Sequence, residues 1–247
     1  MTDTAVSTFR QRFDLLRAAQ KRRTGVPLYT LAVNRPVGRV IAAASPRGVT
    51  PNHLTAIGAL FTFAGILYLL VWAEGGLASA LVGVALVVGF FFDSADGQLA
   101  RLRGGGSASG EWLDHVIDGI RIVLLHIATL AFLLRTEAVP TWLAFTLCTV
   151  FVVAASATFF AGSLFEKLTT SAPRTQVTSG SRLRSALMLP VDYGVTCWLF
   201  LLTAVVPVFV VVYALAALAK VGTTSMLLAK WWRTLRREDR ERRATPA

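Results

Sequence analysis

The sequence predicts an all-α protein that crosses a membrane several times, and two observations support this prediction. The 247 residues are 54% hydrophobic and 16% charged, with a mean hydropathy of +0.58, which is too apolar for an ordinary soluble domain. The apolar residues also gather in runs of about 20, the length that a helix needs to cross the hydrocarbon. We therefore expect six transmembrane helices, near 53–73, 78–100, 112–134, 141–165, 186–205 and 207–230.

The residues before the first span are predicted to lie along the membrane surface. Apolar residues recur at helical spacing through 6–23, with arginines mostly on the other side, and this pattern predicts an interfacial amphipathic helix. The stretch 28–44 is only mildly apolar, so we expect a juxtamembrane helix there. The chain is thus divided into interfacial helices over 1–48, a six-helix transmembrane domain over 49–230 and a basic tail over 231–247.

The basic residues, which give a net charge of +11, predict the orientation in the membrane. Six spans place both termini and the connections after the second and fourth spans on one face, where nearly all loop arginines and lysines lie. The opposite face has one basic residue, Arg135, so the positive-inside rule puts both termini in the cytoplasm. The spread of the charges suits anionic lipid headgroups and excludes a nucleic-acid patch. The high Ala, Val, Arg and Gly content indicates a GC-rich bacterial genome, and the expected location is the cell membrane.

Four aspartates lie where the second and third spans meet. Asp93 and Asp96 are three residues apart at the end of one helix, and Asp114 and Asp118 are four apart at the start of the next. Each pair therefore shares a helix face, and a Gly-rich turn at 104–106 lets the two pairs face each other. Carboxylates this close need cations to offset their repulsion. All-oxygen ligation indicates Mg²⁺, two ions in number, with Mn²⁺ as a substitute.

Small residues and one arginine accompany the first aspartate pair. Gly97 and Ala100 lie near Asp96 on the helix and let a bulky group approach the backbone closely. Arg101 has the shape to hold a pair of phosphate oxygens. Together with the metals, these residues indicate a site for a nucleotide diphosphate.

One ordered pattern resembles the signature of the CDP-alcohol phosphotransferase family at every fixed position: Asp93-x2-Asp96-Gly97-x2-Ala100-Arg101-x8-Gly110-x3-Asp114-x3-Asp118. Eight specified positions arise by chance in a chain of this length with a probability on the order of 10⁻⁸. The six-span layout, the interfacial helix and the Thr50-Pro51-Asn52 entry into the first span extend the resemblance over most of the chain.

The resemblance implies a role for each of these residues. Asp93, Asp96 and Asp114 hold the metals and the CDP diphosphate, while Asp118 is the catalytic general base and shares in metal binding. The pocket for CDP is lined by Gly97, Ala100, Arg101 and Gly110, with Asn52 from the first span. The implied reaction moves a substituted phosphoryl group to a hydroxyl and releases CMP, and members of the family often pair as homodimers.

The donor and the acceptor are left open by these residues. CDP-diacylglycerol is the common donor of the family, in phospholipid biosynthesis, but the stretch 29–39 resembles di-myo-inositol-phosphate synthase domains that use other CDP-linked alcohols. A polyol or polyol phosphate is the expected acceptor. Its phosphate fits the basic residues after the fourth span, which the positive-inside rule explains equally well. These are Lys167, Arg174, Arg182 and Arg184.

Asp192 lies just inside the fifth predicted span and has two readings. It binds acceptor hydroxyls, or it has a structural partnership with a neighbouring arginine.

Two readings from other classes compete with the enzyme. A cation transporter would use the aspartates as an ion path, but the acidic residues cluster at one membrane face, and Gly97, Ala100 and Arg101 would have no role. An inactive lipid-binding homologue is the other alternative, and the complete set of four aspartates argues against it.

Overall fold

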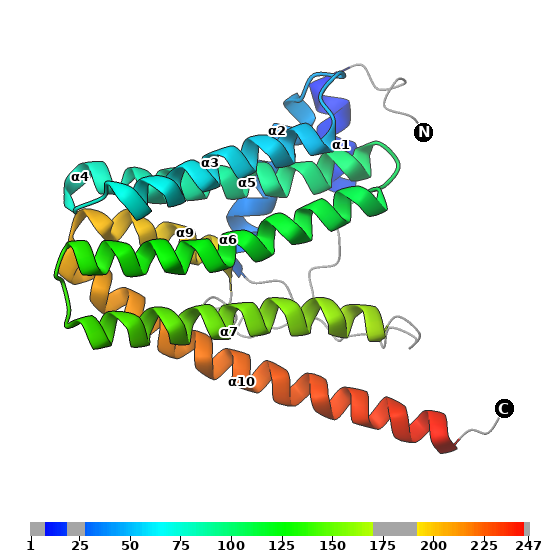
Figure 1. Ribbon diagram of the computed structural model, residues 1–247. Helices are drawn as coiled ribbons and strands as arrows, with labels where there is room; N and C mark the ends of the chain where they lie inside the picture. The colour runs from blue at the N-terminus through cyan, green and yellow to red at the C-terminus, as the bar shows by residue number, and fades with distance from the viewer. Residues whose placement is uncertain (1–7, 19–27, 170–191, 245–247) are drawn as a thin grey trace.

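The computed structural model describes residues 8–18, 28–169 and 192–244, and every regular element within these ranges is helical. The all-α prediction is therefore confirmed for this part of the chain. The long helices form a bundle, and α1 (Phe9–Ala18) lies at the same end of it as the last turns of the final helix, as Figure 1 shows.

Five helices are long and apolar enough to cross a membrane, which identifies an integral membrane protein. They correspond to the spans predicted near 53–73, 78–100, 112–134, 141–165 and 207–230. The short helix α4 (Gly76–Ser79) leads into the second of them. The five are α3 (Pro51–Val71), α5 (Leu81–Leu102), α6 (Ala108–Arg135), α7 (Thr141–Leu168) and α10 (Val206–Ala244).

The predicted span over 186–205 is described only from Asp192 onward. There the chain forms α9 (Tyr193–Leu199) and a turn of 3₁₀-helix, Phe200–Ala204. This apolar helix is by itself too short to cross the hydrocarbon. Residues 186–191 lie outside the described residues, so a sixth span stays a prediction.

Local chemistry sets the starts of the helices that carry the site. Thr50 caps α3 through a capping box, since its hydroxyl accepts from His53 N at 3.3 Å and its own N–H donates to His53 Nδ1 at 3.2 Å. Ser107 caps α6 by accepting from Gly110 N at 3.0 Å. Pro207 falls in the first turn of α10, where a missing N–H costs no helical hydrogen bond.

Close packing of α3 against α5 positions the second helix. A Cβ on Gly89 would lie 2.8 Å from the Gly58 carbonyl oxygen, and one on Gly58 would lie 2.9 Å from the Gly89 carbonyl oxygen. Small residues let helix backbones approach closely in a membrane, where packing replaces the hydrophobic effect as the main attraction. α6 packs against α3 on one side and α7 on the other, and α10 packs against α7.

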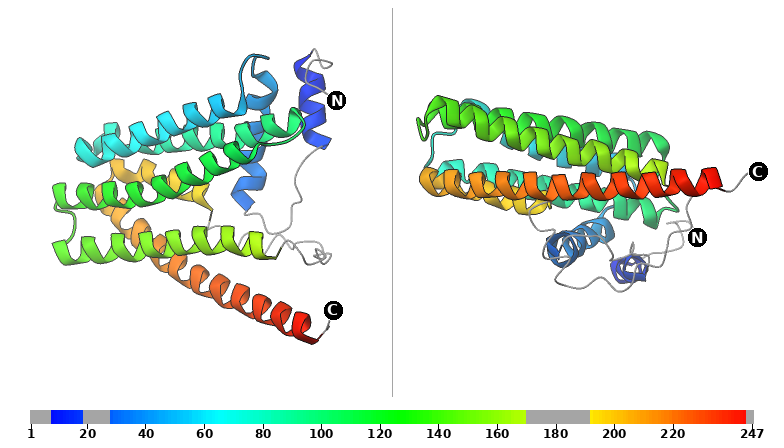
Figure 2. Two further views of the ribbon diagram at one scale, coloured as in Figure 1. Left: turned by 45° about the vertical axis from the view of Figure 1, so that its right-hand side comes forward. Right: turned by 90° about the horizontal axis from the view of Figure 1, so that it is seen from below.

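The N-terminal helices cross the end of the bundle. α1, the π-turn Thr30–Asn34 and α2 (Arg35–Ala44) run across the direction of the long helices in Figure 2, as helices on a membrane surface would. The amphipathic helix predicted over 6–23 is present over the described residues of α1, where Leu16 is buried and Phe9 is exposed.

α10 continues as one helix through the segment predicted as a basic tail, up to Ala244. Arginine, lysine and glutamate are good helix formers, which explains why no helix end marks the boundary at residue 230.

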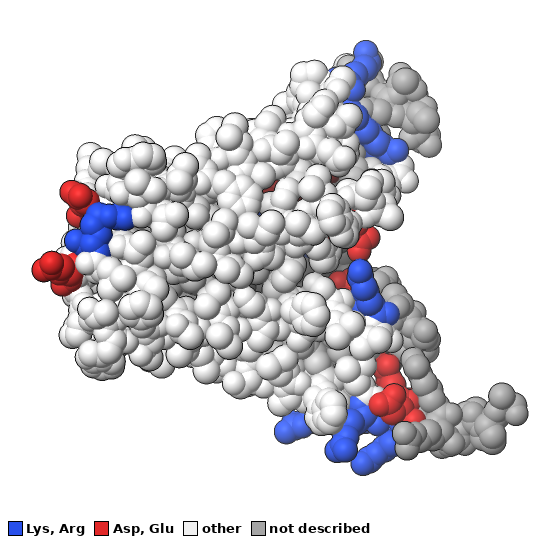
Figure 3. Space-filling view, viewed as in Figure 1, with Lys and Arg blue, Asp and Glu red and all other residues white. Residues whose placement is uncertain are grey.

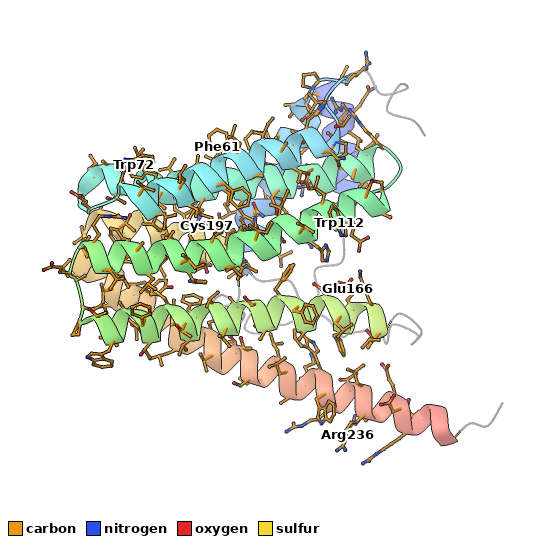
Figure 4. The ribbon with its side chains drawn as sticks, viewed as in Figure 1. Phe61, Trp72, Trp112, Glu166, Cys197 and Arg236 are labelled. Atoms are coloured by element: carbon orange, nitrogen blue, oxygen red, sulfur yellow. The ribbon has the colours of Figure 1, made fainter. Side chains whose placement is uncertain are left out.

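The two ends of the bundle carry its charge. In Figure 3 the charged side chains gather mainly at the two ends of the visible face, and only small patches of Asp or Glu show between them. Trp72 and Trp112, both exposed, lie at opposite ends in Figure 4, as is usual at the two membrane interfaces. Arg135, at the end far from the N-terminal helices, caps α3: its guanidinium donates to the carbonyls of Ala73 at 2.7 Å, Leu69 at 3.3 Å and Leu70.

Candidate active site and metal centre

The turn between α5 and α6 brings the aspartates to one end of the bundle. Gly104 and Gly105 have φ values of +97° and +132°, which side chains rarely adopt. Their N–H groups donate to the carbonyls of Arg101 at 3.2 Å and Ala100 at 3.0 Å, which closes the end of α5. The Gly-rich turn predicted at 104–106 thus reverses the chain within a few residues, and Asp114 and Asp118 return beside Asp93.

Three of the four predicted aspartates form a compact cluster. Carboxylate oxygens of Asp93, Asp114 and Asp118 lie within 4.8 Å of one another, and this is the one such group of potential metal ligands among the described residues. The donors are all oxygens, with no His or Cys in the group, so they fit a hard divalent cation such as Mg²⁺.

Asp96 lies outside this cluster because α3 supplies it with another partner. The hydroxyl of Thr55 donates to Asp96 Oδ2 at 2.5 Å, and the aspartate is 8% exposed. Asp96 nevertheless shares a pocket with Asp93 and Asp114, so it is available to a ligand bound there.

Arg121 is a member of the site that the sequence reasoning missed. Its guanidinium lies 2.5 Å from Asp118 Oδ1 and 3.4 Å from Asp93 Oδ1, and it packs 4.0 Å from the centre of the Tyr193 ring. The side chain is 5% exposed. It was recognisable as an arginine inside an apolar segment, where a charge needs a partner, three residues after Asp118 on the same helix face.

A pocket of about 210 Å³, which we call the charged pocket, opens beside the aspartates. Of the predicted CDP-binding residues, Gly97 and Arg101 line it. A Cβ on Gly97 would meet only the end of the Arg101 side chain, at 3.7 Å, so this part of the helix backbone is accessible. The pocket is lined by Thr30, Arg35, Asp93, Ser94, Asp96, Gly97, Arg101 and Asp114.

The other three predicted CDP-binding residues do not line this pocket. A Cβ on Gly110 would lie 3.4 Å from Asn52 Oδ1 and 3.1 Å from Ser107 Oγ, so these residues pack together where α3 and α6 begin. Ala100 is half-buried on α5 and accepts the hydrogen bond from Gly105 N.

A second pocket, of about 180 Å³, is lined by Asp118 and by other residues of α6, α7, α9 and α10. Lys220 is its one lysine; it is 8% exposed and forms no ion pair among the described residues. Of the four predicted aspartates, Asp118 lines this second pocket, whereas the other three line the charged pocket. The lining residues are Asp118, Arg121, Ile122, Leu125, His126, Phe151, Ala155, Thr158, Phe159, Tyr193, Thr196 and Lys220.

Asp192 is held by three hydrogen bonds within the fold. It accepts from the N–H and the hydroxyl of Thr30, at 3.0 and 2.8 Å, and from Gly194 N, at 2.9 Å. It is 3% exposed, caps α9 and ties this helix to the N-terminal segment. Of the predicted acceptor-binding arginines, Arg174, Arg182 and Arg184 lie outside the described residues, and Lys167 lies in the last turn of α7.

Comparison with known proteins identifies a matching family and two relatives. The model of the family described as CDP-alcohol phosphatidyltransferase matches residues 48–229. Archaetidylinositol phosphate synthase of Pyrococcus horikoshii is 41% identical over 87 residues, which are 35% of this chain and 43% of that protein. Cholinephosphotransferase 1 of Xenopus laevis is 30% identical over 104 residues, which are 40% of this chain and 26% of that protein. The matches thus span less than half the length of either relative.

Proposed function

We propose, from the premise that this chain belongs to the CDP-alcohol phosphatidyltransferase family, that it transfers a phosphatidyl group from CDP-diacylglycerol to a hydroxyl of a polyol or polyol phosphate and releases CMP. Membership makes it a transferase of substituted phosphate groups. The observation that carries the proposal is the position of Asp118, which lines the second pocket while its carboxylate lies within 4.8 Å of those of Asp93 and Asp114, which line the charged pocket. A group between the two pockets would reach both a donor and an acceptor.

The donor belongs in the charged pocket. Asp93, Asp96 and Asp114 would hold Mg²⁺, two ions in our proposal, with Mn²⁺ as a substitute, and Arg101 would bind an oxygen of the diphosphate. Bound divalent cations neutralise the diphosphate and stabilise CMP as it leaves. Gly97 leaves room beside the helix backbone for the donor, and Ala100, Gly110 and Asn52 would shape the surroundings of the nucleotide.

The acceptor belongs in the second pocket, with its hydroxyl against Asp118. The Asp118 carboxylate accepts the hydroxyl proton while the oxygen attacks the phosphorus. Arg121 fixes the orientation of that carboxylate through their 2.5 Å contact. Direct displacement needs no covalent intermediate with the protein.

Lys220 is the group in this pocket that suits an anionic part of the acceptor, such as a phosphate. Arg174, Arg182, Arg184 and Asp192 remain candidates for further acceptor contacts.

The membrane position follows from the distribution of charge. We place the active site and both termini in the cytoplasm, at the bacterial cell membrane, because the site lies at the end of the bundle that has the N-terminal helices. Lipids surround the apolar faces, and a homodimer is the assembly that the resemblance implies.

The test is CMP release by the purified protein with Mg²⁺, using CDP-diacylglycerol or a water-soluble CDP-polyol as donor and a panel of polyols and polyol phosphates as acceptors. We expect release with CDP-diacylglycerol that depends on one acceptor and disappears in Asp118→Asn. Release only with the water-soluble donor would move the proposal to the di-myo-inositol-phosphate-synthase-like alternative. A protein that binds no CDP compound would overturn the proposed function.

A further inference from the structure

The motif Asn34-Arg35-Pro36-x-Gly38-Arg39 in the N-terminal helices has no role in the reaction described so far. It lies outside the residues matched by the family model, which begin at residue 48. Arg35 of this motif and Thr30 of the preceding π-helical turn line the charged pocket together with Asp93, Asp96 and Asp114. The pocket is therefore closed on one side by a segment that crosses the end of the bundle.

Direct contact between α2 and α5 holds Arg35 at the pocket. A Cβ on Gly38 would lie 2.6 Å from Ser94 Oγ and 2.9 Å from Gln98 Nε2, so the glycine allows the two helices to touch. Gln98, which is 1% exposed, donates from Nε2 to the carbonyl oxygen of Arg35 at 2.9 Å. The backbone of Arg35 is thus bonded to the helix that carries Asp93 and Asp96.

Two further contacts fix the same segment on either side. Thr30 is bonded to Asp192 at the start of α9, through its N–H and its hydroxyl. Arg39 lies over the ring of Phe13 in α1, with the guanidinium carbon 5.3 Å from the ring centre. Contacts with α1, α5 and α9 thus fix the position of this segment at the edge of the pocket.

The charges of the pocket indicate which kind of ligand the N-terminal segment binds. The carboxylates on α5 and α6 attract metal cations, whereas a guanidinium repels them and binds oxyanions. Arg35 and Arg101 place two guanidinium groups around one pocket of about 210 Å³. A diphosphate bound together with metal cations would offer an oxyanion to each guanidinium, while the carboxylates would hold the metals.

We propose that Arg35 binds a phosphate oxygen of the donor diphosphate, so that the N-terminal segment is part of the active site. The proposal rests on the proposed function. The same chemistry is present in the phosphate of a polyol phosphate acceptor, and the experiment separates these two sources.

The experiment measures equilibrium binding of CDP, CMP and cytidine with Mg²⁺, and the KM values for donor and acceptor, in Arg35→Gln and Arg35→Lys. Arg10→Gln is the matched control, because Arg10 is an exposed arginine on α1 at the same end of the bundle. We expect Arg35→Gln to weaken CDP binding about tenfold or more, CMP binding less, and cytidine binding not at all. The donor KM should rise while the acceptor KM and the unfolding temperature stay unchanged, and lysine should restore part of the loss.

Other results would overturn the proposal in distinct ways. Wild-type CDP affinity in Arg35→Gln would show that Arg35 binds no donor phosphate. A rise in the acceptor KM alone would assign Arg35 to the acceptor. If Arg35→Gln does not fold, wild-type CDP affinity and donor KM in Arg35→Lys, which lacks the planar fork, would also contradict the proposal. A wild-type protein that binds no CDP would contradict the proposed function itself, before any variant is compared.

Discussion

The two pockets beside the aspartate cluster differ in chemistry. The charged pocket is lined almost entirely by polar and charged residues, among them three carboxylates and two guanidinium groups. Most of the exposed lining of the second pocket is apolar, although seven of its twelve residues, among them Asp118, Arg121 and Lys220, carry a polar group. We infer that the donor is recognised by charge and metal, which suits a diphosphate common to many substrates. The acceptor is recognised by shape and a small number of contacts, which suits specificity for one alcohol.

The largest effect on activity is expected from substitution of Asp118, which belongs to the aspartate cluster and lines the second pocket. Asp118→Asn should lower CMP release about 10³-fold, since the amide cannot accept the hydroxyl proton. CDP binding should change far less, because the other three aspartates face the donor. Single-turnover kinetics and CDP titration measure the two effects, and Asp118→Asn with wild-type turnover would remove Asp118 as the base.

Removal of Arg121 should have the next largest effect. Arg121→Gln leaves Asp118 and Asp93 without their buried cation, and breaking such a pair costs about 3–5 kcal/mol of stability. Misorientation of the base should also lower kcat about a hundredfold. Thermal unfolding and kcat measured over a range of Mg²⁺ concentrations check both effects.

Added Mg²⁺ should narrow the gap in unfolding temperature between Arg121→Gln and the wild type, because the ion supplies positive charge to the same carboxylates. Arg121→Lys, which keeps the charge, is the matched control. An unchanged kcat in Arg121→Gln would limit Arg121 to a structural role.

Lys220→Met should affect only ligand binding in the second pocket. We expect the KM for a phosphorylated acceptor to rise about tenfold, with the KM for an unphosphorylated alcohol and the CDP affinity unchanged. Lys230→Met on the exposed part of α10 is the matched control. Equal effects on both kinds of acceptor would rule out Lys220 as an anion site.

The smallest effect on activity is expected at the opposite end of the bundle. Arg135→Gln removes hydrogen bonds to three carbonyls at the end of α3. Stability should fall by about 1–3 kcal/mol, and kcat and both KM values should stay unchanged. Urea or thermal unfolding together with steady-state kinetics tests this separation, and a changed donor KM would show that the two ends are coupled.

The sequence by itself determined the features that depend on neighbouring residues. Runs of apolar residues predicted five helices that the structure has, because crossing the hydrocarbon requires length and apolarity alone. Asp114 and Asp118 were predicted to face Asp93 from helical spacing and the Gly104–Gly106 turn, which bring three of the four aspartates together.

Only the tertiary structure decided which partners each charged group meets. Thr55 separates Asp96 from the cluster, Arg121 joins it, and Arg35 reaches the pocket from more than 50 residues away along the chain. Arg135, which ends α6, caps α3, and Asp192 bonds to Thr30 and Gly194. These pairings depend on how α2, α3, α5 and α9 pack, and helical periodicity carries no information about contacts between helices distant in sequence.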